Sequence, residues 1–147
     1  IIYISESSYP IHVNMRTGTV MSIQATATGR VFSAYQPPAL IDKMLLDDRI
    51  RLGPDIAHPL GADVVQEMIQ DVRRRGVSKG VNYPTPGVVS FAAPVFDYSG
   101  NMVLGITLMG SSGQFDIAWD GPEARALLQC AEGVSRRLGF AGERHVA

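Results

Sequence analysis

The sequence has few of the features that form disulfides, give a strong net charge or anchor a protein in a membrane. It contains one cysteine, Cys130, so no disulfide can form within it, and this favours a reducing compartment. Thirteen basic and 14 acidic residues give a formal net charge of −1, unlike the basic balance of a nucleic-acid-binding domain. No apolar run approaches the roughly 20 residues of a membrane span, and no signal segment is recognisable. We therefore expect a cytoplasmic protein that makes no contact with membranes.

Residues for catalysis or metal binding are also scarce. From Val72 to Phe96 there is no Asp or Glu to act as a general base or as a hard-metal ligand. His12, His58 and His145 are far apart and form no spaced pair with Cys130 or a carboxylate. The run Gly110-Ser111-Ser112-Gly113 lacks the spacing of a nucleophile elbow. We expect no enzyme activity, no metal site and no cofactor.

The strongest pattern in the chain is the stretch from Gly87 to Gly110. Two arms rich in Val, Ile, Phe, Thr and Leu flank the polar turn 97–101, which predicts an antiparallel hairpin. Both arms are almost entirely apolar, so both faces of the hairpin are expected to be covered. Ser90 and Thr107 nevertheless place hydroxyl groups inside it. A buried hydroxyl requires a partner, which is either the protein's own backbone or a ligand.

The remaining patterns predict an α+β domain of 147 residues around a central antiparallel sheet. Because the chain begins at Ile1 in strand-like sequence without a Met, we expect a longer polypeptide to precede it. The expected elements are short strands at 1–4, 11–15 and 19–23, a short helix through 31–35, a helix beginning at Pro38, a helix at 61–75, a strand at 77–81, the hairpin, and a final helix whose start is marked by Asp120 and Glu123.

Three places in the sequence need an interpretation of their own. The segment Thr26–Arg30 is typical either of an anion-binding helix start or of a simple N-cap, and the sequence does not decide between them. Cys130 lies beside the apolar stripe of the final helix and is expected to be a buried small hydrophobe. Phe115 and Trp119 are expected in the core.

With these residues assembled, the chain resembles the effector-binding C-terminal domain of IclR-family bacterial transcriptional regulators. Three blocks carry the likeness: GTVMSIQATATGR at 18–30, VRRRGV at 72–77 and AAPVFD at 92–97, and VSRRLG at 134–139 agrees with them. The resemblance implies a GAF-like fold over 1–147, with a central curved antiparallel sheet flanked by helices. Such folds are expected to have helices on one side of the sheet and a small-molecule pocket on the other. It also implies a DNA-binding winged helix-turn-helix before this domain, absent from this chain.

The resemblance further implies a ligand-binding set. Family pocket positions correspond here to Val13, Met21, Ala27, Thr28, Val88, Ser90, Thr107 and Met109, and the backbone N–H groups of 27–29, including that of Gly29, are expected to meet a carboxylate. The loop after Val77 has no acidic residue, so no metal site is expected, and Lys79 or Tyr83 would replace acidic contacts.

The expected function is therefore sensing of a small-molecule effector, a small organic acid or an aromatic metabolite, in a homodimer or homotetramer. DNA would be bound only through the missing N-terminal domain. The alternative from the residues alone is a pure oligomerisation module whose pocket is closed and whose hydroxyl groups are satisfied internally.

Overall fold

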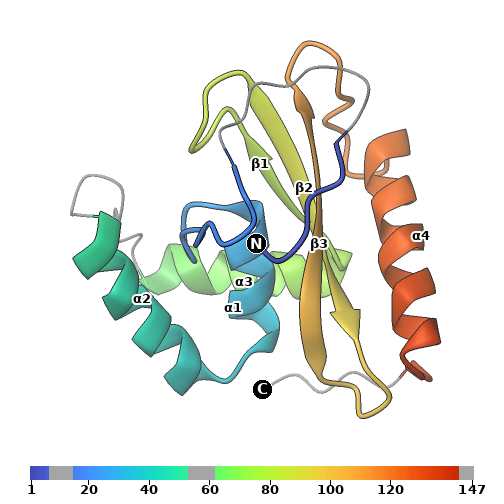
Figure 1. The fold of residues 1–147 in the computed structure, drawn as a ribbon, viewed down its shortest axis with the longest axis horizontal. Helices are drawn as coiled ribbons and strands as arrows, with labels where there is room; N and C mark the ends of the chain where they lie inside the picture. The colour runs from blue at the N-terminus through green and yellow to red at the C-terminus, as the bar shows by residue number, and fades with distance from the viewer. Residues whose placement is uncertain (7–14, 53–61, 143–147) are drawn as a thin grey trace.

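The computed structural model describes residues 1–6, 15–52 and 62–142. In chain order its elements are α1 (Ala27–Tyr35), α2 (Pro38–Leu52), α3 (Ala62–Arg75), β1 (Ser78–Val81), β2 (Val88–Phe96), β3 (Met102–Ser111) and α4 (Pro122–Arg137). The strands form one antiparallel sheet in the order β1-β2-β3. Figure 1 shows α4 against one face of this sheet, α1 and α3 against the other, and α2 at the margin of the molecule. The α+β, GAF-like prediction is confirmed.

The hairpin of β2 and β3 is the centre of the fold, as predicted. Its turn is held by Asp97, whose carboxylate accepts hydrogen bonds from Ser99 and Asn101, and Gly100 supplies the positive φ of 78° that the turn requires. The pairing shifts by one residue between Val95 and Phe96, where a bulge forms. Because successive side chains of a strand alternate between faces, each arm contributes to two cores.

The two cores lie on opposite faces of the sheet. One joins α1 and α3 to the sheet through Ala27, Val31, Ala34, Tyr35, Val72, Ala92, Phe96 and Met102. The other joins α4 to the sheet through Val77, Val89, Phe91, Ala93, Val95, Ala124, Leu127 and Ala131. The expectation of helices on one side only is therefore wrong. Both arms of the hairpin are nearly all apolar because helices cover both faces.

The expected strands at 1–4 and 19–23 are not formed. Residues 1–6 and 15–20 lie in irregular backbone and 23–25 in a turn. The segments meet through two hydrogen bonds of 2.8 Å, from the Ile1 ammonium to the Thr19 carbonyl and from Gly18 N–H to the Ile1 carbonyl. Strand-like composition is insufficient without a continuous ladder of pairing. Of the expected strand at 11–15, only Met15 is among the described residues, and it is not in a strand.

The final helix and the segment before it differ from expectation in three details. Its N-cap is Gly121 with no side-chain hydrogen bond, so the predicted Asp120 cap is wrong, although Pro122 stands in the first turn as expected. Cys130 is exposed rather than buried. It is adjacent in sequence to the buried Ala131, but one residue is a rotation of about 100° around a helix, which turns it away from the core. Phe115 and Trp119 pack, half-buried, at the edge of the core beneath α4.

Candidate functional site

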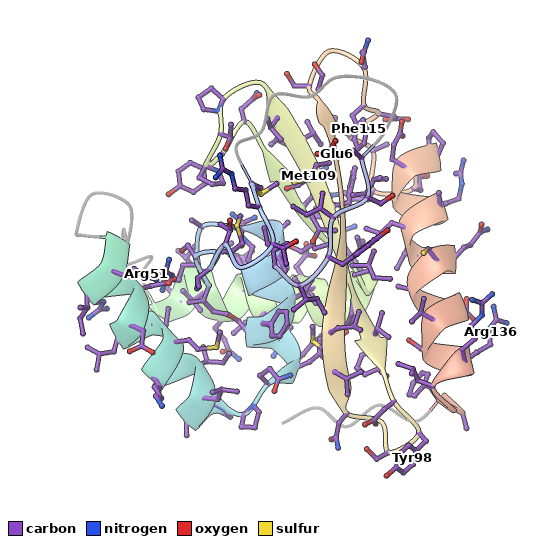
Figure 2. The ribbon with its side chains drawn as sticks, in the orientation of Figure 1. Glu6, Arg51, Tyr98, Met109, Phe115 and Arg136 are labelled. Carbon is purple, nitrogen blue, oxygen red and sulfur yellow. The ribbon has the colours of Figure 1, made fainter. Side chains whose placement is uncertain are left out.

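Most of the predicted ligand-binding residues share one face of the sheet. The register pairs Ser90 with Met109 and Ala92 with Thr107, and Ala92 belongs to the core beneath α1. Alternation therefore places Val88, Ser90, Thr107 and Met109 on the α1 face, where each is half-buried. Figure 2 shows Met109 toward the upper end of the sheet. The common face depends on the register, which the sequence alone does not reveal.

Thr28 meets this face from the first turn of α1. Its Oγ1 lies 2.6 Å from Thr107 Oγ1, a hydrogen bond that joins α1 to β3 across 79 residues of sequence. Beside this pair, a Cβ added at Gly105 would make ordinary van der Waals contacts, at 3.4 Å from Phe32 Cε2 and 3.7 Å from Thr28 Cγ2. The hydroxyl group of Thr107, one of the two expected inside the hairpin, therefore has Thr28 as its partner.

Ser90 makes a second close contact, with Gly80 of β1. A Cβ at Gly80 would lie 2.9 Å from Ser90 Oγ and 3.9 Å from Ala27 Cβ. A side chain at position 80 would crowd the Ser90 hydroxyl, whereas the distance to Ala27 is an ordinary van der Waals contact. Ala27, Thr28 and Ser90 consequently surround one small region at the junction of α1 with the sheet.

The start of α1 is closed by its own backbone and side chains. Thr26 Oγ1 accepts a hydrogen bond from Gly29 N–H at 3.0 Å and donates to the Ser22 carbonyl at 2.7 Å. The Ala25 N–H donates to Ser22 Oγ at 3.1 Å. Thr26 is thus an N-cap, and one of the backbone N–H groups expected to meet a carboxylate is already bound.

Arg30 is a charged residue of this region that is missing from the predicted ligand-binding residues. Its Nη1 donates to the Lys79 carbonyl at 2.9 Å, while its Nε is buried without a hydrogen-bond partner among the described residues. Burial lowers the pKa of the guanidinium, and the nearby Tyr83 opposes that shift. With Ser33 and Gln24, Arg30 borders a cavity of about 20 Å³ between α1 and α3. Its position at the end of the GTVMSIQATATGR block was the available signal.

Met21 lies elsewhere. It borders a cavity of about 360 Å³ between α2 and the turn before α1, lined by Val20, Met21, Ile23, Met44, Asp47, Asp48, Ile50 and Arg51. Asp48 is buried there and accepts hydrogen bonds of 2.6 Å from Ile23 N–H and from Arg51 Nη2. Figure 2 shows Arg51 at the C-terminal end of α2. Val13 lies outside the described residues.

Lys79 belongs to the opposite face of the sheet. It pairs with Phe91 of the α4 core, and its Nζ donates to the Ile117 carbonyl and lies 4.2 Å from the centre of the Trp119 ring. Burial and the neighbouring Arg75 lower the pKa of its ammonium, and Asp116 opposes this. The expectation that Lys79 replaces acidic contacts near the pocket is therefore wrong for this residue. Tyr83 is 46% exposed.

The described residues form neither a metal-binding cluster nor a membrane-spanning helix. Residues 1–6, 15–52 and 62–142 contain no group of three or more His, Cys, Asp or Glu side chains that could hold a metal ion. Over the same part of the chain, no helix is long and apolar enough to cross a membrane.

Comparison with known proteins agrees with the fold. Residues 1–136 match the family described as the bacterial transcriptional regulator IclR C-terminal domain. Over 97% of this chain and 55% of its own, the crystal structure of Pseudomonas aeruginosa HmgR superposes with a TM-score of 0.84 at 23% identity. Thermotoga maritima IclR superposes over 92% of this chain and 55% of its own, with a TM-score of 0.76 at 22% identity.

Curated relatives are transcriptional regulators rather than enzymes. The HTH-type transcriptional regulator BhcR of Paracoccus denitrificans is 26% identical over 131 residues, which are 89% of this chain and 47% of BhcR. The glycerol operon regulatory protein of Streptomyces coelicolor is 28% identical over 130 residues, covering 85% of this chain and 49% of the relative. The chain thus spans about half the length of these relatives. The family match extends over residues 1–136 of 147. The chain therefore belongs to the IclR family of bacterial transcriptional regulators and corresponds to their C-terminal domain.

Proposed function

We propose that this domain binds a small organic acid or an aromatic metabolite between the start of α1 and the facing side of β2 and β3. The proposed ligand contacts are Ala27, Thr28, Gly29, Val88, Ser90, Thr107 and Met109. Val13 joins them through the family resemblance alone, and Met21 is left out because it borders the separate cavity beside α2. In the full-length regulator, a winged helix-turn-helix would precede the domain and bind DNA. The regulator would act in the cytoplasm as a homodimer or homotetramer, and the ligand would control its affinity for DNA.

The observation that carries this proposal is the pair of hydroxyl groups of Thr28 and Thr107, 2.6 Å apart. Each hydroxyl offers one proton and two lone pairs, so one shared hydrogen bond leaves one proton and several lone pairs of the pair unused. A ligand carboxylate or hydroxyl can accept that proton. Ser90 adds a third hydroxyl on the same face of the sheet, close to Gly80.

The surrounding residues favour a small ligand with an apolar body. Val88 and Met109 are half-buried on the same face, and Ala27 is buried beside it. Apolar walls with a few directed polar groups are typical of small-molecule sites. A charge-assisted hydrogen bond from a hydroxyl to a carboxylate contributes about 1.5–3 kcal/mol. The guanidinium of Arg30, held against β1, adds positive charge at the same end of the sheet.

Regulation would follow from a difference in affinity between two arrangements of the regulator. A ligand shifts such an equilibrium only by the free-energy difference with which it binds the two states. A coupling of about 1–3 kcal/mol changes operator affinity roughly 5- to 150-fold. The hydrogen bond between Thr28 of α1 and Thr107 of β3 lies where a ligand would alter the packing of α1 on the sheet.

One observation favours the alternative of a pure oligomerisation module. Thr28 and Thr107 bond directly to each other, as expected if the hydroxyl groups are satisfied internally. In that case no small molecule enters between α1 and the sheet, and substitution of either threonine changes stability without changing any binding.

Isothermal titration calorimetry of the chain against a panel of small aliphatic and aromatic carboxylates tests the proposal. We expect at least one compound to bind at one site per chain, and Thr28→Val or Thr107→Val to weaken it about tenfold, the equivalent of one lost hydrogen bond. The control is Thr17→Val, in an exposed turn, which should leave the affinity unchanged. An absence of binding throughout the panel, or equal affinity in all three variants, would contradict the proposal.

A further inference from the structure

The cavity between α2 and the turn before α1 takes no part in the ligand site proposed between α1 and the sheet. Its volume of about 360 Å³ falls within the range of roughly 300–1,000 Å³ that is usual for small-molecule sites. Figure 1 shows α2 at the margin of the molecule, with α1 between it and the sheet. The described residues that give the cavity apolar walls are Val20, Met21, Ile23, Met44 and Ile50.

Two of these apolar side chains are left open to solvent. Val20 is 61% exposed and Ile50 is 77% exposed, one on the turn and the other on α2. Aliphatic side chains exposed on both sides of a hollow are typical of a surface that binds an apolar group. The thioethers of Met21 and Met44 suit an aromatic ring in particular, because sulfur makes favourable contacts with ring edges.

A buried ion pair fixes the spacing of the two walls. The Asp48 side chain is 7% exposed, and its oxygens accept hydrogen bonds from Ile23 N–H and from Arg51 Nη2, both at 2.6 Å. Arg51 Nη1 donates in turn to the Val20 carbonyl at 3.0 Å. Breaking a buried ion pair is costly, so α2 and the turn are held together at both ends of the segment 20–23.

The charges of the lining favour a cation. Arg51 is paired with Asp48, whereas Asp47 also lines the cavity and forms no ion pair within the described ranges. Two carboxylates against one guanidinium give the lining a formal charge of −1. Asp48 accepts two hydrogen bonds in the described part of the chain, and a carboxylate has about four acceptor positions. A ligand ammonium would be attracted here and a ligand carboxylate repelled.

We propose that this cavity is a second ligand site, which takes an arylalkylamine: an aromatic ring joined by a short aliphatic chain to a protonated amine. The ring packs between Met21, Met44 and Ile50, and the ammonium donates to Asp47 and to the free acceptor positions of Asp48. The site between α1 and the sheet instead offers hydroxyl groups beside the Arg30 guanidinium. The two sites therefore differ in the charge of the ligand that they favour, and neither depends on the other.

Methyl NMR of the chain labelled at its methionines tests the site with three compounds that share a phenylethyl group. These are phenethylamine, 2-phenylethanol and 3-phenylpropionate, whose head groups are cationic, neutral and anionic. We expect phenethylamine to shift the Met21 and Met44 methyl signals and to leave that of Met109 unchanged. The titration curves should give the affinity order amine, alcohol, acid, with the amine about tenfold tighter than the acid, because only the head group differs.

Two substitutions separate the head-group contact from the apolar one. Asp47→Asn should weaken phenethylamine about fivefold and leave 2-phenylethanol unchanged, since it removes one charge of a solvent-exposed ion pair. Its control is Asp42→Asn, an exposed carboxylate of the same helix outside the lining. Ile50→Ala should weaken both compounds about fivefold through lost apolar contact. Its control is Leu46→Ala, which is 58% exposed on α2 and also outside the lining.

Circular dichroism checks that every variant folds. The inference is overturned if phenethylamine leaves Met21 and Met44 unshifted, if the three head groups bind equally, or if the control substitutions weaken binding as much as their counterparts. Shifts by phenethylamine at Met109 alone would place the amine between α1 and the sheet and would overturn it as well. Binding of carboxylates near Met109 is a separate readout, so either site can fail without the other.

Discussion

At the residue scale, the Asp97 turn shows how one carboxylate closes the central hairpin. Its Oδ1 accepts hydrogen bonds from the Ser99 hydroxyl at 2.6 Å, the Ser99 N–H at 2.9 Å and the Asn101 N–H at 3.2 Å. The Ser99 hydroxyl is the main cause that lowers the pKa of Asp97 from its ordinary 3.8, desolvation opposes it, and the backbone N–H groups add to the lowering.

This lowered pKa predicts a stability difference that depends on pH. Because the folded pKa lies below the unfolded value, the contribution is fully present above about pH 4 and is lost as pH falls through the folded pKa. Wild type should therefore melt at a higher temperature than Asp97→Asn at pH 6, and the two curves should converge toward pH 3. Ser99→Ala should lose part of the same pH-dependent increment, because it removes the hydroxyl but keeps the backbone N–H groups. A gap that stays constant between pH 6 and pH 3 would refute this role.

Also at the residue scale, buried-hydroxyl reasoning predicted that Thr107 needs a partner, and the partner is Thr28. Which face of the sheet each residue occupies was harder to predict from the sequence. The hairpin arms are almost entirely apolar and lack a polar–apolar alternation. The sequence therefore does not reveal which of their residues face α1 and which face α4. Lys79 is on the α4 face for a reason visible only in the register, its pairing with Phe91.

At the scale of elements, two helical glycines have opposite roles. In α1, a Cβ at Gly29 would lie 2.2 Å from the Ile23 carbonyl oxygen and 2.5 Å from Ile23 Cα, which are backbone atoms that cannot yield. In α4, a Cβ at Gly133 would meet nothing within 4 Å. The first glycine lets the turn before α1 pack against the helix, whereas the second only lowers helix propensity.

We therefore predict opposite effects of the same substitution. Gly29→Ala should lower the free energy of unfolding by about 2–3 kcal/mol, because the turn must move away from α1. Gly133→Ala should raise it by about 0.5–1 kcal/mol, since alanine is the better helix former. Urea denaturation of both variants measures the difference. Similar losses of stability in the two variants would contradict this account of the start of α1.

The elements with strong local signals were predictable for physical reasons. The hairpin combines β-branched arms with a turn that closes locally, and α2 begins at Pro38, directly after Pro37. The N-terminal strands failed because a strand needs a paired neighbour, and residues 1–6 meet 15–20 through only two backbone hydrogen bonds in the described part of the chain. The Asp120 cap failed because Gly121 takes the N-cap position.

At the scale of the whole molecule, the residues predicted to bind a ligand fall in two separate regions. The junction of α1 with the sheet contains most of the predicted ligand contacts, and Met21 borders a separate cavity beside α2. That division was not predictable from sequence, because it depends on how the turn before α1 packs against α2 through Asp48. The methionines are distributed over both regions and can report on each.

The most direct test of the ligand site is methyl NMR of the chain labelled at its methionines and threonines, titrated with the same carboxylate panel. We predict that a binding compound shifts the methyl signals of Met109, Thr28 and Thr107, while Met44, beside α2, changes little. Shifts confined to Met21 and Met44 would place the ligand in the cavity beside α2. That outcome, or an absence of shifts at every methyl group, would contradict a ligand site between α1 and the sheet.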